Sequence, residues 1–499
     1  MPMRPELPEY LYSAAATREL DAQIIAAGTP GLELMQRAAD AVWRDLRRRW
    51  PETRRLTVLC GAGHNAGDGY LVAVLARRAG WCVQVLAVSP VQRLRGDAAQ
   101  AWQQAVDAGV EIQPWPASLP QDGLLLDALL GTGLQNEVRE PYSSAIAGIN
   151  ASRLPVIAVD LPSGLNADTG AIAGSAVRAD MTVSFIALKP GLFTAEGPDL
   201  VGELCFAPLA ELPEHRVAPV LQRLTLDSCK TLLPKRPKAA HKGMFGHLLL
   251  IGGNRGMGGA IMLAAETALR SGAGKVSVAT RSEHVAPLLA RCPEVMAHGV
   301  ENPSQLTPLL AQATAVVIGP GLGRDAWARQ MLDQALSREL PRILDADALN
   351  MLATRPVPLG KQTVVTPHPA EAGRMLGCST AQVQQDRLPA VRQLAERFDC
   401  AAVLKGVGSL VDDAAGGQLP GLCIQGNPGM ASAGMGDVLS GLVGALLAQG
   451  LSAGAAARYA VLLHALAGDR AARERGQLGL LASDLIEHIG YYLNLQDIR

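Results

Sequence analysis

Short runs of Val, Ile and Leu recur along the whole chain, and this recurrence is the feature that most restricts its fold. Each run is nearly continuous in apolar residues and is followed by a glycine-rich or polar turn and then a helical pattern. The runs lie at residues 56–60, 83–89, 123–131, 155–164 and 181–188 in the first half, and at 246–253, 275–280, 315–323, 342–350, 363–371 and 401–409 in the second. Continuous apolar runs are typical of parallel strands covered on both faces. The pattern therefore predicts an α/β fold made of doubly wound sheets.

The chain is expected to form two domains. Its 499 residues exceed what one hydrophobic core usually organises. Residues 212–243, which are rich in proline and charge and have no long period, separate the two sets of strands. We place the boundary near residue 225, which gives domains at 1–225 and 226–499. A helical segment at residues 18–49 precedes the first strand, and its apolar stripe is expected to pack on the sheet.

Charge and cysteine usage argue against several classes of protein. Lys+Arg number 45 and Asp+Glu 46, so the net charge of -1 gives no support for a nucleic-acid partner. The eight cysteines show no C-x-x-C spacing, which favours reduced thiols in the cytoplasm over disulfides or a zinc site. Residues 1–20 contain no apolar stretch like that of a signal peptide.

One uncharged stretch, residues 438–457, is about long enough to span a bilayer. It contains Ser440, Gln449 and several glycines, and Gly450 is expected to interrupt it. We interpret it as two buried helices of a soluble domain and expect no membrane partner. An apolar helix such as residues 455–467 serves either the core or an interface, and we expect a homo-oligomer.

The first strand leads into a glycine-rich loop within VLCGAGHNAGDGY, residues 58–70. Residues 61–66 match G-x-G-x-x-A, the phosphate-binding turn of a Rossmann unit. The match lacks the acidic residue that should end the second strand, because that strand ends at Ser89. Asn65 and Asp68 instead place amide and carboxylate oxygens in the loop. These features predict a Rossmann-like domain whose loop differs from an ordinary dinucleotide-binding turn.

Three strand ends of the first half carry oxygen-bearing side chains: Asn65, Asp127 and Ser163. The carboxyl ends of parallel strands meet in one crevice. An all-oxygen set with a single carboxylate suits a hard monovalent cation such as K⁺ rather than zinc or copper. Alternatively, each residue caps a helix or fixes a turn. Three such residues beside glycine turns favour the cation site, whereas His64 is interpreted as a loop residue without a ligand role.

Asp160 and Lys189 follow the next two strands of the first half. Asp160 should therefore face the same crevice. Lys189 is either a solvated lysine or reaches into the crevice to meet a phosphate or Asp160.

The densest glycine segment is QGNPGMASAGMGDVLSGLVGALLAQG, residues 425–450. Its small residues lead into an apolar helix that is predicted to start at Asp437. Bare backbone amides at a helix N-terminus, together with the helix dipole, bind anions. Asp437 either caps the helix or acts as a base beside the anion, and the density of glycines favours the base.

This segment resembles the anion hole of ribokinase-like enzymes, in which GxGD stabilises a transferred phosphoryl group and its Asp deprotonates a hydroxyl. Two other loops fit such a site. Residues 405–409 (KGVGS) are expected to contact nucleotide phosphates. His368 in TPHPAE either contacts a substrate or orders its loop, and residues 319–323 (GPGLG) allow close approach of a ligand to the backbone.

Taken together, the motifs resemble those of the bacterial bifunctional NAD(P)H-hydrate repair enzymes over nearly the whole chain. The motifs are GHNAGDG in the first half and KGMFGHLLLIGG, GPGLG, TPHPAE, KGVGS and NPGMASAGMGD in the second. The first loop departs from the family's GNNGGDG, because His64 and Ala66 replace Asn and Gly. Asn65 and Asp68 remain, so an ion site is expected to survive, and the backbone freedom at Ala66 is in question.

The resemblance implies a Rossmann-like epimerase domain followed by a ribokinase-like dehydratase domain. Reduced nicotinamide cofactors gain water at ring carbon 6 and give R and S epimers. The first domain would interconvert the epimers. The second would use ADP, accompanied by Mg²⁺, to phosphorylate the hydroxyl of the S epimer; loss of phosphate then restores NAD(P)H, with AMP as the other product.

The resemblance also implies roles for individual residues. The expected contacts of the first domain with the hydrate are His64, Asn65, Ala66, Gly67, Asp68, Gly131, Thr132, Gly133, Leu134, Gln135, Asn136, Glu137 and Asp160, with K⁺ on Asn65, Asp127 and Ser163. The expected contacts of the second domain are Ala260, Gly323, His368 and Asp437 for the hydrate, and Lys405, Gly406, Val407, Gly408, Ser409 and Gly436 for the nucleotide. Asp160 and Asp437 are the expected catalytic residues.

The remaining alternative is a ribokinase-type small-molecule kinase fused to a Rossmann-like domain without catalytic activity. The second half opens directly with KGMFGHLLLIGG and shows no separate β-lid segment, which argues against it.

Overall fold

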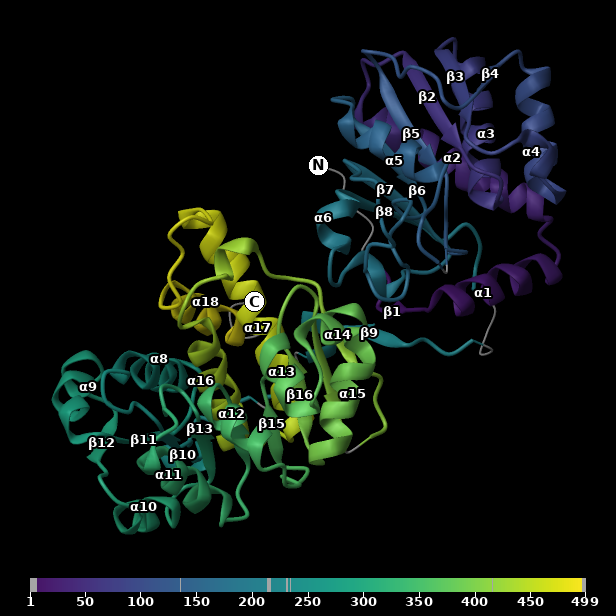
Figure 1. Cartoon of the computed structure of the whole chain (residues 1–499). Helices are drawn as coiled ribbons and strands as arrows, with labels where there is room; N and C mark the ends of the chain where they lie inside the picture. Colours follow the sequence, from purple (N-terminus) through teal and green to yellow (C-terminus); the bar gives the residue numbers. More distant parts are fainter. Residues whose placement is uncertain are drawn as a thin grey trace. The chain divides into compact units, whose positions relative to one another are not determined.

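The structure, a computed structural model, describes residues 7–134, 136–212, 217–229, 232–233, 235–414 and 416–495. The chain divides into two compact units, Met1–Leu221 (unit 1) and Gln222–Arg499 (unit 2), which are coloured purple to teal and teal to yellow in Figure 1. Each unit is a doubly wound α/β domain with its own sheet, as the sequence predicts.

Unit 1 contains a parallel sheet in the order β4-β3-β2-β5-β6-β7-β8. Its strands are β2 (Arg55–Cys60), β3 (Cys82–Ala87), β4 (Glu111–Pro114), β5 (Leu124–Ala128), β6 (Val156–Val159), β7 (Met181–Phe185) and β8 (Glu203–Ala207), and a two-residue strand, β1 (Tyr10–Leu11), precedes them. The central strands β5, β6 and β7 are buried at every residue, so their sequences are mostly apolar, with Asp127, Thr182 and Ser184 as buried polar exceptions. The edge strands β4 and β8 are more exposed, and the apolar pattern did not predict them.

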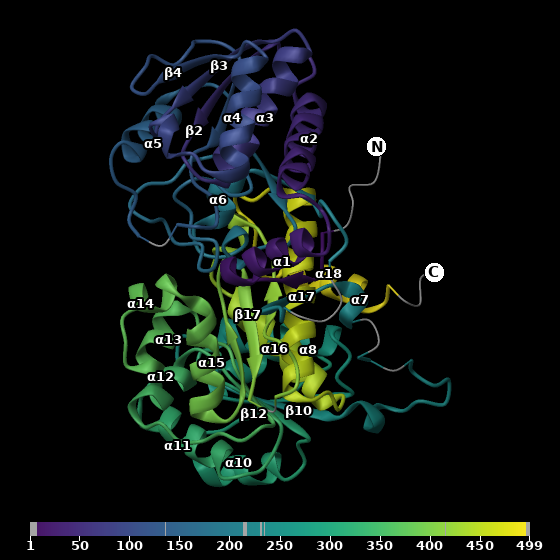
Figure 2. The ribbon, with the colours of Figure 1, turned by 90° about the vertical axis from the view of Figure 1, so that its right-hand side faces the viewer.

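The helices of unit 1 cover both faces of this sheet. They are α1 (Ala14–Ala26), α2 (Gly31–Arg49), α3 (His64–Arg78), α4 (Gly96–Asp107), α5 (Tyr142–Ala151) and α6 (Gly197–Val201). The predicted helical segment at residues 18–49 is two helices, because Gly28, with φ +114°, and Pro30 separate α1 from α2. In Figure 2, α2, α3 and α4 lie on one side of the sheet and α5 on the other. Strand order reverses between β2 and β5, where doubly wound sheets bind ligands.

Unit 2 contains a longer sheet with the order β9-β18-β17-β16-β15-β14-β13-β10-β11-β12. Its strands are β9 (Leu221–Arg223), β10 (His247–Ile251), β11 (Lys275–Thr280), β12 (Met296–Gly299), β13 (Ala315–Ile318), β14 (Arg342–Leu344), β15 (Thr363–Val365), β16 (Ala401–Leu404), β17 (Ser409–Asp413) and β18 (Gly421–Cys423). Only β16–β17 and β17–β18 pair antiparallel. The short strands β9, β12 and β18 lie outside the predicted runs. Strand order reverses between β10 and β13.

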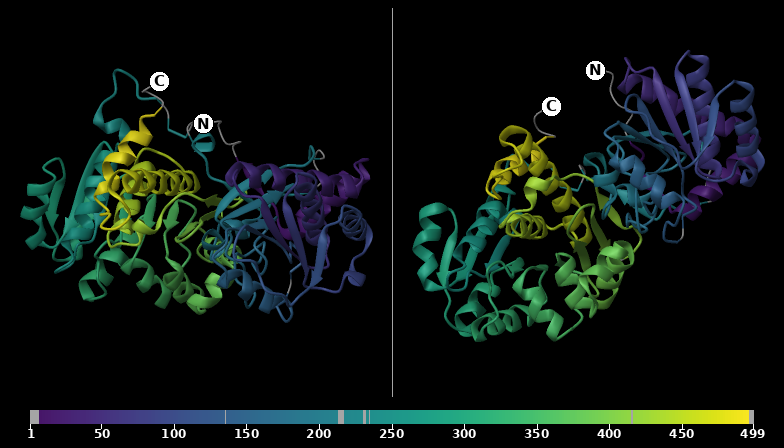
Figure 3. Two further views of the ribbon diagram at one scale, coloured as in Figure 1. Left: turned by 90° about the horizontal axis from the view of Figure 1, so that it is seen from above. Right: turned by 45° about the horizontal axis from the view of Figure 1, so that its top comes forward.

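Helices cover both faces of the second sheet as well. They are α7 (Leu226–Cys229), α8 (Gly258–Arg270), α9 (Val285–Arg291), α10 (Pro303–Leu310), α11 (Ala326–Leu336), α12 (Asp347–Thr354), α13 (Pro369–Leu376), α14 (Thr380–Gln385), α15 (Arg387–Phe398), α16 (Met435–Ala448), α17 (Ala453–Arg475) and α18 (Asp484–Leu493). α8 and α16 pack on β10, whereas α15 packs on β16 and β17. Figure 3 shows the yellow helices α16 and α17 on one side of the sheet and the green helices on the other.

The uncharged stretch at residues 438–457 forms two helices, as predicted. α16 ends at Ala448, Gly450 adopts φ +94°, and α17 begins at Ala453. Most of residues 455–467 are buried in the core of unit 2, so this helix serves the core rather than a free face. Among the residues that the structure describes, none of the helices combines the length and the hydropathy needed to cross a membrane.

The tightest helix contact in unit 2 lies where α16 crosses α8. A Cβ atom placed on Gly441 would lie 2.2 Å from the carbonyl oxygen of Ala264. We predict that Gly441→Ala lowers the unfolding free energy of unit 2 by about 1–3 kcal/mol, because two backbones must separate to admit the methyl group. Chemical denaturation followed by circular dichroism would measure the change.

Gly490→Ala is the matched control for this prediction. Gly490 also lies in a helix, α18, but a Cβ atom there meets no other atom within 4 Å. Alanine has the higher helix propensity, so this variant should be neutral or more stable by up to about 1 kcal/mol. If the two variants had equal unfolding free energies, α8 and α16 would be able to separate and admit the methyl group at no cost in stability, which would contradict the prediction.

Candidate functional site

Unit 1 has a cavity of about 750 Å³ at the carboxyl ends of its strands, where the strand order reverses. Its wall is formed by the segments that follow β2, β5, β6 and β7, together with α1 and α2. Ten residues predicted to contact the hydrate line it: His64, Asn65, Asp68, Gly131, Thr132, Gly133, Leu134, Asn136, Glu137 and Asp160. Gln135 lies outside the described residues. The structure thus brings most of the predicted residues of the first half to one cavity.

Asp160 follows β6 with φ +65°, a conformation that residues other than glycine rarely adopt. Its Oδ1 accepts hydrogen bonds from Lys189 Nζ at 2.5 Å, from the backbone N–H of Phe185 at 3.1 Å and from Ser184 Oγ at 3.2 Å. The sequence left open whether Lys189 is solvated or reaches into the crevice. Lys189 is 0 % exposed, and the structure shows that it contacts Asp160. Among the described residues all of these donors bind Oδ1, which leaves Oδ2 for a ligand.

A cluster of buried oxygen-bearing side chains, Asn65, Asp127 and Ser163, adjoins the cavity, and Asn65 also lines it. Asp127, which is 0 % exposed, accepts hydrogen bonds from Ser163 Oγ at 2.6 Å and from Ser163 N at 2.8 Å. Ser163 Oγ accepts from Leu130 N at 2.8 Å, and Asn65 Nδ2 donates to Leu130 O at 3.1 Å. Burial raises the pKa of Asp127 to about 6, although the hydrogen bonds from Ser163 lower it. A cation would offset the burial of this carboxylate, so the donor set fits a hard monovalent ion.

The segment from His64 to Asp68 is helical, and its prediction as a loop was wrong. α3 begins at His64, with Gly63 as its N-cap. The glycine and polar residues of this segment suggested a loop. However, the Asn65 side-chain amide donates its hydrogen bond to Leu130 O and does not compete for the backbone groups of its own helix. Ala66 is 0 % exposed and Gly67 packs on Met35, so neither lines the cavity. A helical position suits alanine, which answers the question raised by the replacement at Ala66.

Two further carboxylates face the cavity of unit 1. Burial raises the pKa of Asp68 well above its usual range, and Asp160 and Asp21 raise it further. Burial also raises the pKa of Asp21, although nearby His64 lowers it. Asp21 lies on α1, one turn after Arg18, whose Nη1 donates to Thr132 O at 2.7 Å. The sequence prediction missed these two α1 residues, because a helix before the first strand matches no motif.

In unit 2, Asp437 lies in the first turn of α16. The helix starts at Met435, two residues before the predicted start, and Gly434, with φ +92°, is its N-cap. Asp437 is therefore not the cap. Burial raises its pKa to about 7, with a further rise from Asp345 and an opposing effect of Lys405. A carboxylate that titrates near neutral pH suits a general base.

Lys405, Asp345 and Ser440 form a hydrogen-bonded group beside this turn, in which Asp345 and Ser440 are buried and Lys405 is partly exposed. Lys405 Nζ lies 2.9 Å from Asp345 Oδ1, and Asp345 Oδ2 accepts a hydrogen bond from Ser440 Oγ at 2.8 Å. Gly436 lies against the pair, because a Cβ atom there would be 3.4 Å from Asp345 Oδ2 and 3.5 Å from Lys405 Nζ. The sequence prediction missed Asp345, although it directly follows β14, the same signal that pointed to Asp160.

The glycine loops after β10 and β13 meet at the point where the strand order of unit 2 reverses. Asn254 joins them: its N–H donates to Gly321 O at 2.7 Å and its Nδ2 to Leu322 O at 3.1 Å. Gly323, with φ +73°, donates its N–H to Asp347 Oδ2 at 2.9 Å. Ala260 lies on α8 beside Gly321. The two predicted hydrate contacts, Ala260 and Gly323, therefore share one edge of the sheet.

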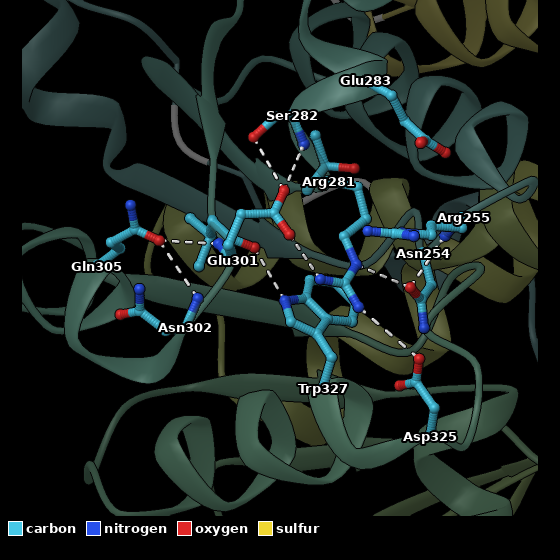
Figure 4. A network of polar contacts seen from close by, with 12 residues as sticks. Asn254, Arg255, Arg281, Ser282, Glu283, Glu301, Asn302, Gln305, Asp325 and Trp327 are labelled. Atoms are coloured by element: carbon cyan, nitrogen blue, oxygen red, sulfur yellow. Dashed lines mark hydrogen bonds and ion pairs between the residues drawn. The ribbon is translucent and has the colours of Figure 1, made fainter.

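Arg281 ties these loops to the neighbouring strand ends (Figure 4). Its Nε donates to Asn254 Oδ1 at 2.9 Å and its Nη1 to Glu301 Oε2 at 2.7 Å. The guanidinium carbon lies 4.4 Å from the centre of the Trp327 ring, and Glu301 Oε1 also binds Ser282. The segments that follow β10, β11, β12 and β13 are thereby fixed to one another.

His368 caps α13. Its Nδ1 accepts hydrogen bonds from Ala370 N at 3.1 Å and Glu371 N at 3.4 Å, while Glu371 Oε2 accepts from His368 N at 2.9 Å. Burial lowers the pKa of His368, as do Lys405 and Arg374. Because Nδ1 accepts hydrogen bonds, the neutral ring carries its proton on Nε2. The structure thus shows the loop-ordering role that the sequence left open.

The KGVGS loop follows β16 and exposes its tip. Gly406 has φ +136° and Gly408 has φ +65°, which favour glycine. Ser409 Oγ closes the loop with contacts to Gly406 N at 3.3 Å and Gly406 O at 3.0 Å. Val407 is 55 % exposed. The loop is thus preformed on one side and open to a ligand on the other.

Comparison with known proteins agrees with this division into two sites. A family model described as NAD(P)H-hydrate dehydratase matches residues 248–490, and one described as YjeF-related protein N-terminus matches residues 31–191. A bifunctional NAD(P)H-hydrate repair enzyme of Coxiella burnetii is 46% identical over 97% of this chain and 99% of its own length. One from Escherichia coli is 44% identical over 93% of this chain and 89% of its own length.

A solved structure also resembles unit 2. The ADP/ATP-dependent NAD(P)H-hydrate dehydratase of Bacillus subtilis, co-crystallised with ATP/Mg²⁺, aligns with a TM-score of 0.50 and 29% identity over 55% of this chain and 98% of its own. Both family models, the full-length relatives and this structure agree, and the chain belongs to the family of bifunctional NAD(P)H-hydrate repair enzymes.

Proposed function

We propose that this chain repairs hydrated NADH and NADPH with two separate active sites. Residues 1–225 interconvert the R and S hydrates, and residues 226–499 dehydrate the S hydrate with ADP. The observation that carries the proposal is the pairing of a ligand-sized cavity around Asp160 in unit 1 with a carboxylate, Asp437, beside a glycine-lined helix start in unit 2. The relatives from Coxiella burnetii and Escherichia coli, which align over most of this chain, are named bifunctional NAD(P)H-hydrate repair enzymes.

In unit 1, Asp160 is the catalytic residue. Its Oδ1 is held by Lys189 and the backbone of Phe185, which fixes the carboxylate at the cavity wall and leaves Oδ2 for the hydrate. The hydrate binds along His64–Asp68 and residues 131–137. Ala66 and Gly67 do not line the cavity, and their role is to allow the close packing of α3 below it. A carboxylate held in this way can exchange a proton with the hydroxyl at ring carbon 6.

A potassium ion is expected on Asn65, Asp127 and Ser163. Among the described residues no group of three or more His, Cys, Asp or Glu side chains is placed to hold a metal ion, so a transition-metal site is not favoured there. When bound, the ion would supply positive charge beneath the cavity wall. The residues of the chain fix that wall through the Ser163 and Asn65 contacts with Leu130.

In unit 2, Asp437 takes the proton of the hydrate hydroxyl. The hydroxyl oxygen then bonds to the terminal phosphorus of ADP, and the bond from that phosphorus to the bridging oxygen of AMP breaks. Phosphate then leaves ring carbon 6 with the electron pair of the C–O bond while carbon 5 loses a proton to solvent, which restores the ring double bond and gives NAD(P)H. The start of α16, with Gly434 and Gly436, directs backbone amides toward the developing negative charge.

The nucleotide is expected at Lys405–Ser409 and Gly436, and the hydrate at Ala260, Gly323, His368 and Asp437. Mg²⁺ would be held chiefly by the nucleotide phosphates, as this ion usually is. The donor preference for ADP, assembly into a homo-oligomer and a cytoplasmic location are parts of the same proposal.

The direct test is incubation of the chain with mixed R and S hydrates plus ADP, and separately plus ATP. We expect both epimers to disappear on chromatography, with AMP and phosphate formed and the absorbance of reduced nicotinamide recovered. Formation of a stable phosphorylated product without recovery of this absorbance would favour the ribokinase-type kinase instead.

Asp437→Asn should lower the dehydration rate by at least ~10²-fold, because the hydroxyl loses its general base. Steady-state dehydration of the S hydrate measures this change. Epimerisation by unit 1 in the same preparation is the internal control and should be unaffected. A variant that dehydrates at nearly the normal rate would remove Asp437 from this role.

Dehydration should also depend on pH through Asp437. Its pKa is raised to about 7, so the basic form is lost as the pH falls through that value. We expect kcat/KM to rise between about pH 6 and about pH 8 with an apparent pKa of about 7. Initial rates over this range are the measurement, and a flat profile below pH 7 would contradict the assignment.

Asp160→Asn should abolish epimerisation while dehydration of the S hydrate continues. With ADP in excess, the variant should consume the S epimer and leave the R epimer, as chiral chromatography would show. Asp122→Asn is the matched control, because the Asp122 side chain lies on the surface of unit 1 and is 75% exposed. Unchanged turnover of the R epimer by Asp160→Asn would show that another group is responsible.

A further inference from the structure

Arg387, the first residue of α15, is an unusual charge to find inside unit 2. It is 1 % exposed, and burial of a guanidinium removes its hydration. Its hydrogen bonds go to neutral oxygens: Leu404 O and Lys405 O at 3.3 Å, Gly408 O at 3.4 Å, and Gln384 Oε1 at 2.6 Å. None of these partners carries a negative charge. Burial lowers the pKa of Arg387 to about 10, so the side chain remains a cation at neutral pH.

The carbonyl groups around Arg387 belong to the segment that becomes the KGVGS loop. In a trans peptide the C=O and the N–H point in opposite directions. The peptide between Lys405 and Gly406 turns its oxygen toward Arg387, so its N–H points to the other side, where Ser409 Oγ lies 3.3 Å away. The guanidinium therefore orders the loop from beneath and leaves its amide and hydroxyl groups on the open side.

The fit between the arginine and the loop is close. A Cβ atom on Gly406 would lie 2.9 Å from Arg387 Nη1, and the glycine adopts φ +136°. Gly406 and Val407 are exposed on the opposite side. The cation is thus separated from the surface of the loop by little more than one layer of backbone.

The electrostatic consequence differs from that of Lys405. The charge of Lys405 is matched by Asp345, whose Oδ1 is 2.9 Å from Nζ. The partners of Arg387 in the described chain are neutral oxygens, which accept hydrogen bonds from the guanidinium but do not neutralise its charge. A buried charge of this kind projects a stronger field than a solvated surface charge does, because its surroundings have a low dielectric constant. An anion at the open side of the loop would feel that field.

We propose that Arg387 is a positioning residue for the adenine nucleotide, which holds the KGVGS loop in its phosphate-binding shape and adds positive potential behind it. The inference rests on the proposed function of that loop. It assigns Arg387 to the phosphates of the nucleotide rather than to its base or to the hydrate.

The test compares the wild-type chain with Arg387→Met and Arg387→Lys. Calorimetric titration with MgADP and with adenosine gives the two affinities. In Arg387→Met we expect the affinity for MgADP to fall by about 10- to 100-fold, the scale for losing hydrogen bonds to a charged group. Adenosine, which has no phosphate, should lose less than about 3-fold. Arg387→Lys restores the charge without the planar fork and should recover part of the MgADP affinity.

Arg281→Met is the matched control, because Arg281 is also a largely buried arginine of unit 2 but holds the loops after β10 and β13. If loss of any buried arginine loosened unit 2, both Met variants would weaken MgADP alike. Epimerisation by unit 1 reports the amount of folded chain in each preparation. Should Arg387→Met fail to fold, Gln384→Leu removes the 2.6 Å hydrogen bond that holds the guanidinium and should weaken MgADP while sparing adenosine.

Equal weakening of MgADP and adenosine, or equal affinities of the Met and Lys variants for MgADP, would overturn the proposal and leave Arg387 with a structural role only. Unchanged MgADP affinity in all variants would overturn it too. Hydrate repair by the wild-type chain, measured in parallel, separates this outcome from failure of the proposed function.

Discussion

Both candidate sites depend on single carboxylates that the fold buries at the carboxyl ends of parallel strands. Asp127 and Asp345 are 0 % and 2 % exposed, and a buried carboxylate without partners would destabilise its domain by several kcal/mol. Each therefore has hydrogen-bond partners on both oxygens: Ser163 binds Asp127 through its N–H and its hydroxyl, and Lys405 and Ser440 bind Asp345. Asp160 is paired with Lys189. In each pair the carboxylate lies at the end of a strand, and Ser163, Lys405 or Lys189 lies in a neighbouring loop. The interaction that stabilises the buried carboxylate therefore also holds that loop in place.

The nature of each partner decides what the site can do. Ser163 and Asn65 leave the charge of Asp127 in place, so this corner can attract a cation. Lys189 pairs with Asp160 through Oδ1, so the second oxygen of this cavity-lining carboxylate is left for a ligand. In unit 2, Asp345 pairs with Lys405 close to Asp437. Burial raises the pKa of Asp437, Asp345 raises it further, and Lys405 opposes the rise.

The sequence predicted the central strands and the residues at their ends, because burial on both faces produces runs such as LLLIGG and the motifs follow directly. The sequence-based prediction failed where a contact with a distant part of the chain, rather than a local one, determines the structure. Asn65 suggested a loop, yet its amide binds Leu130 and α3 begins before it. The edge strands β4 and β8 were missed, since their exposed residues dilute the pattern. Arg387 has no motif around it, and only its burial in the fold reveals it.

Two arginines hold the loops of the candidate site in unit 2. Arg281 binds Asn254, which joins the loops after β10 and β13, where we propose that the hydrate binds, whereas Arg387 binds the carbonyls of Leu404, Lys405 and Gly408 in the loop that we propose for the nucleotide. The segment Asp345–Asp347 lies between them, because Asp347 binds Gly323 N on one side and Asp345 binds Lys405 on the other. Asp437 interacts electrostatically with that segment through Asp345. A displacement of the KGVGS loop that moved Lys405 away from Asp345 would therefore change the electrostatic environment of Asp437.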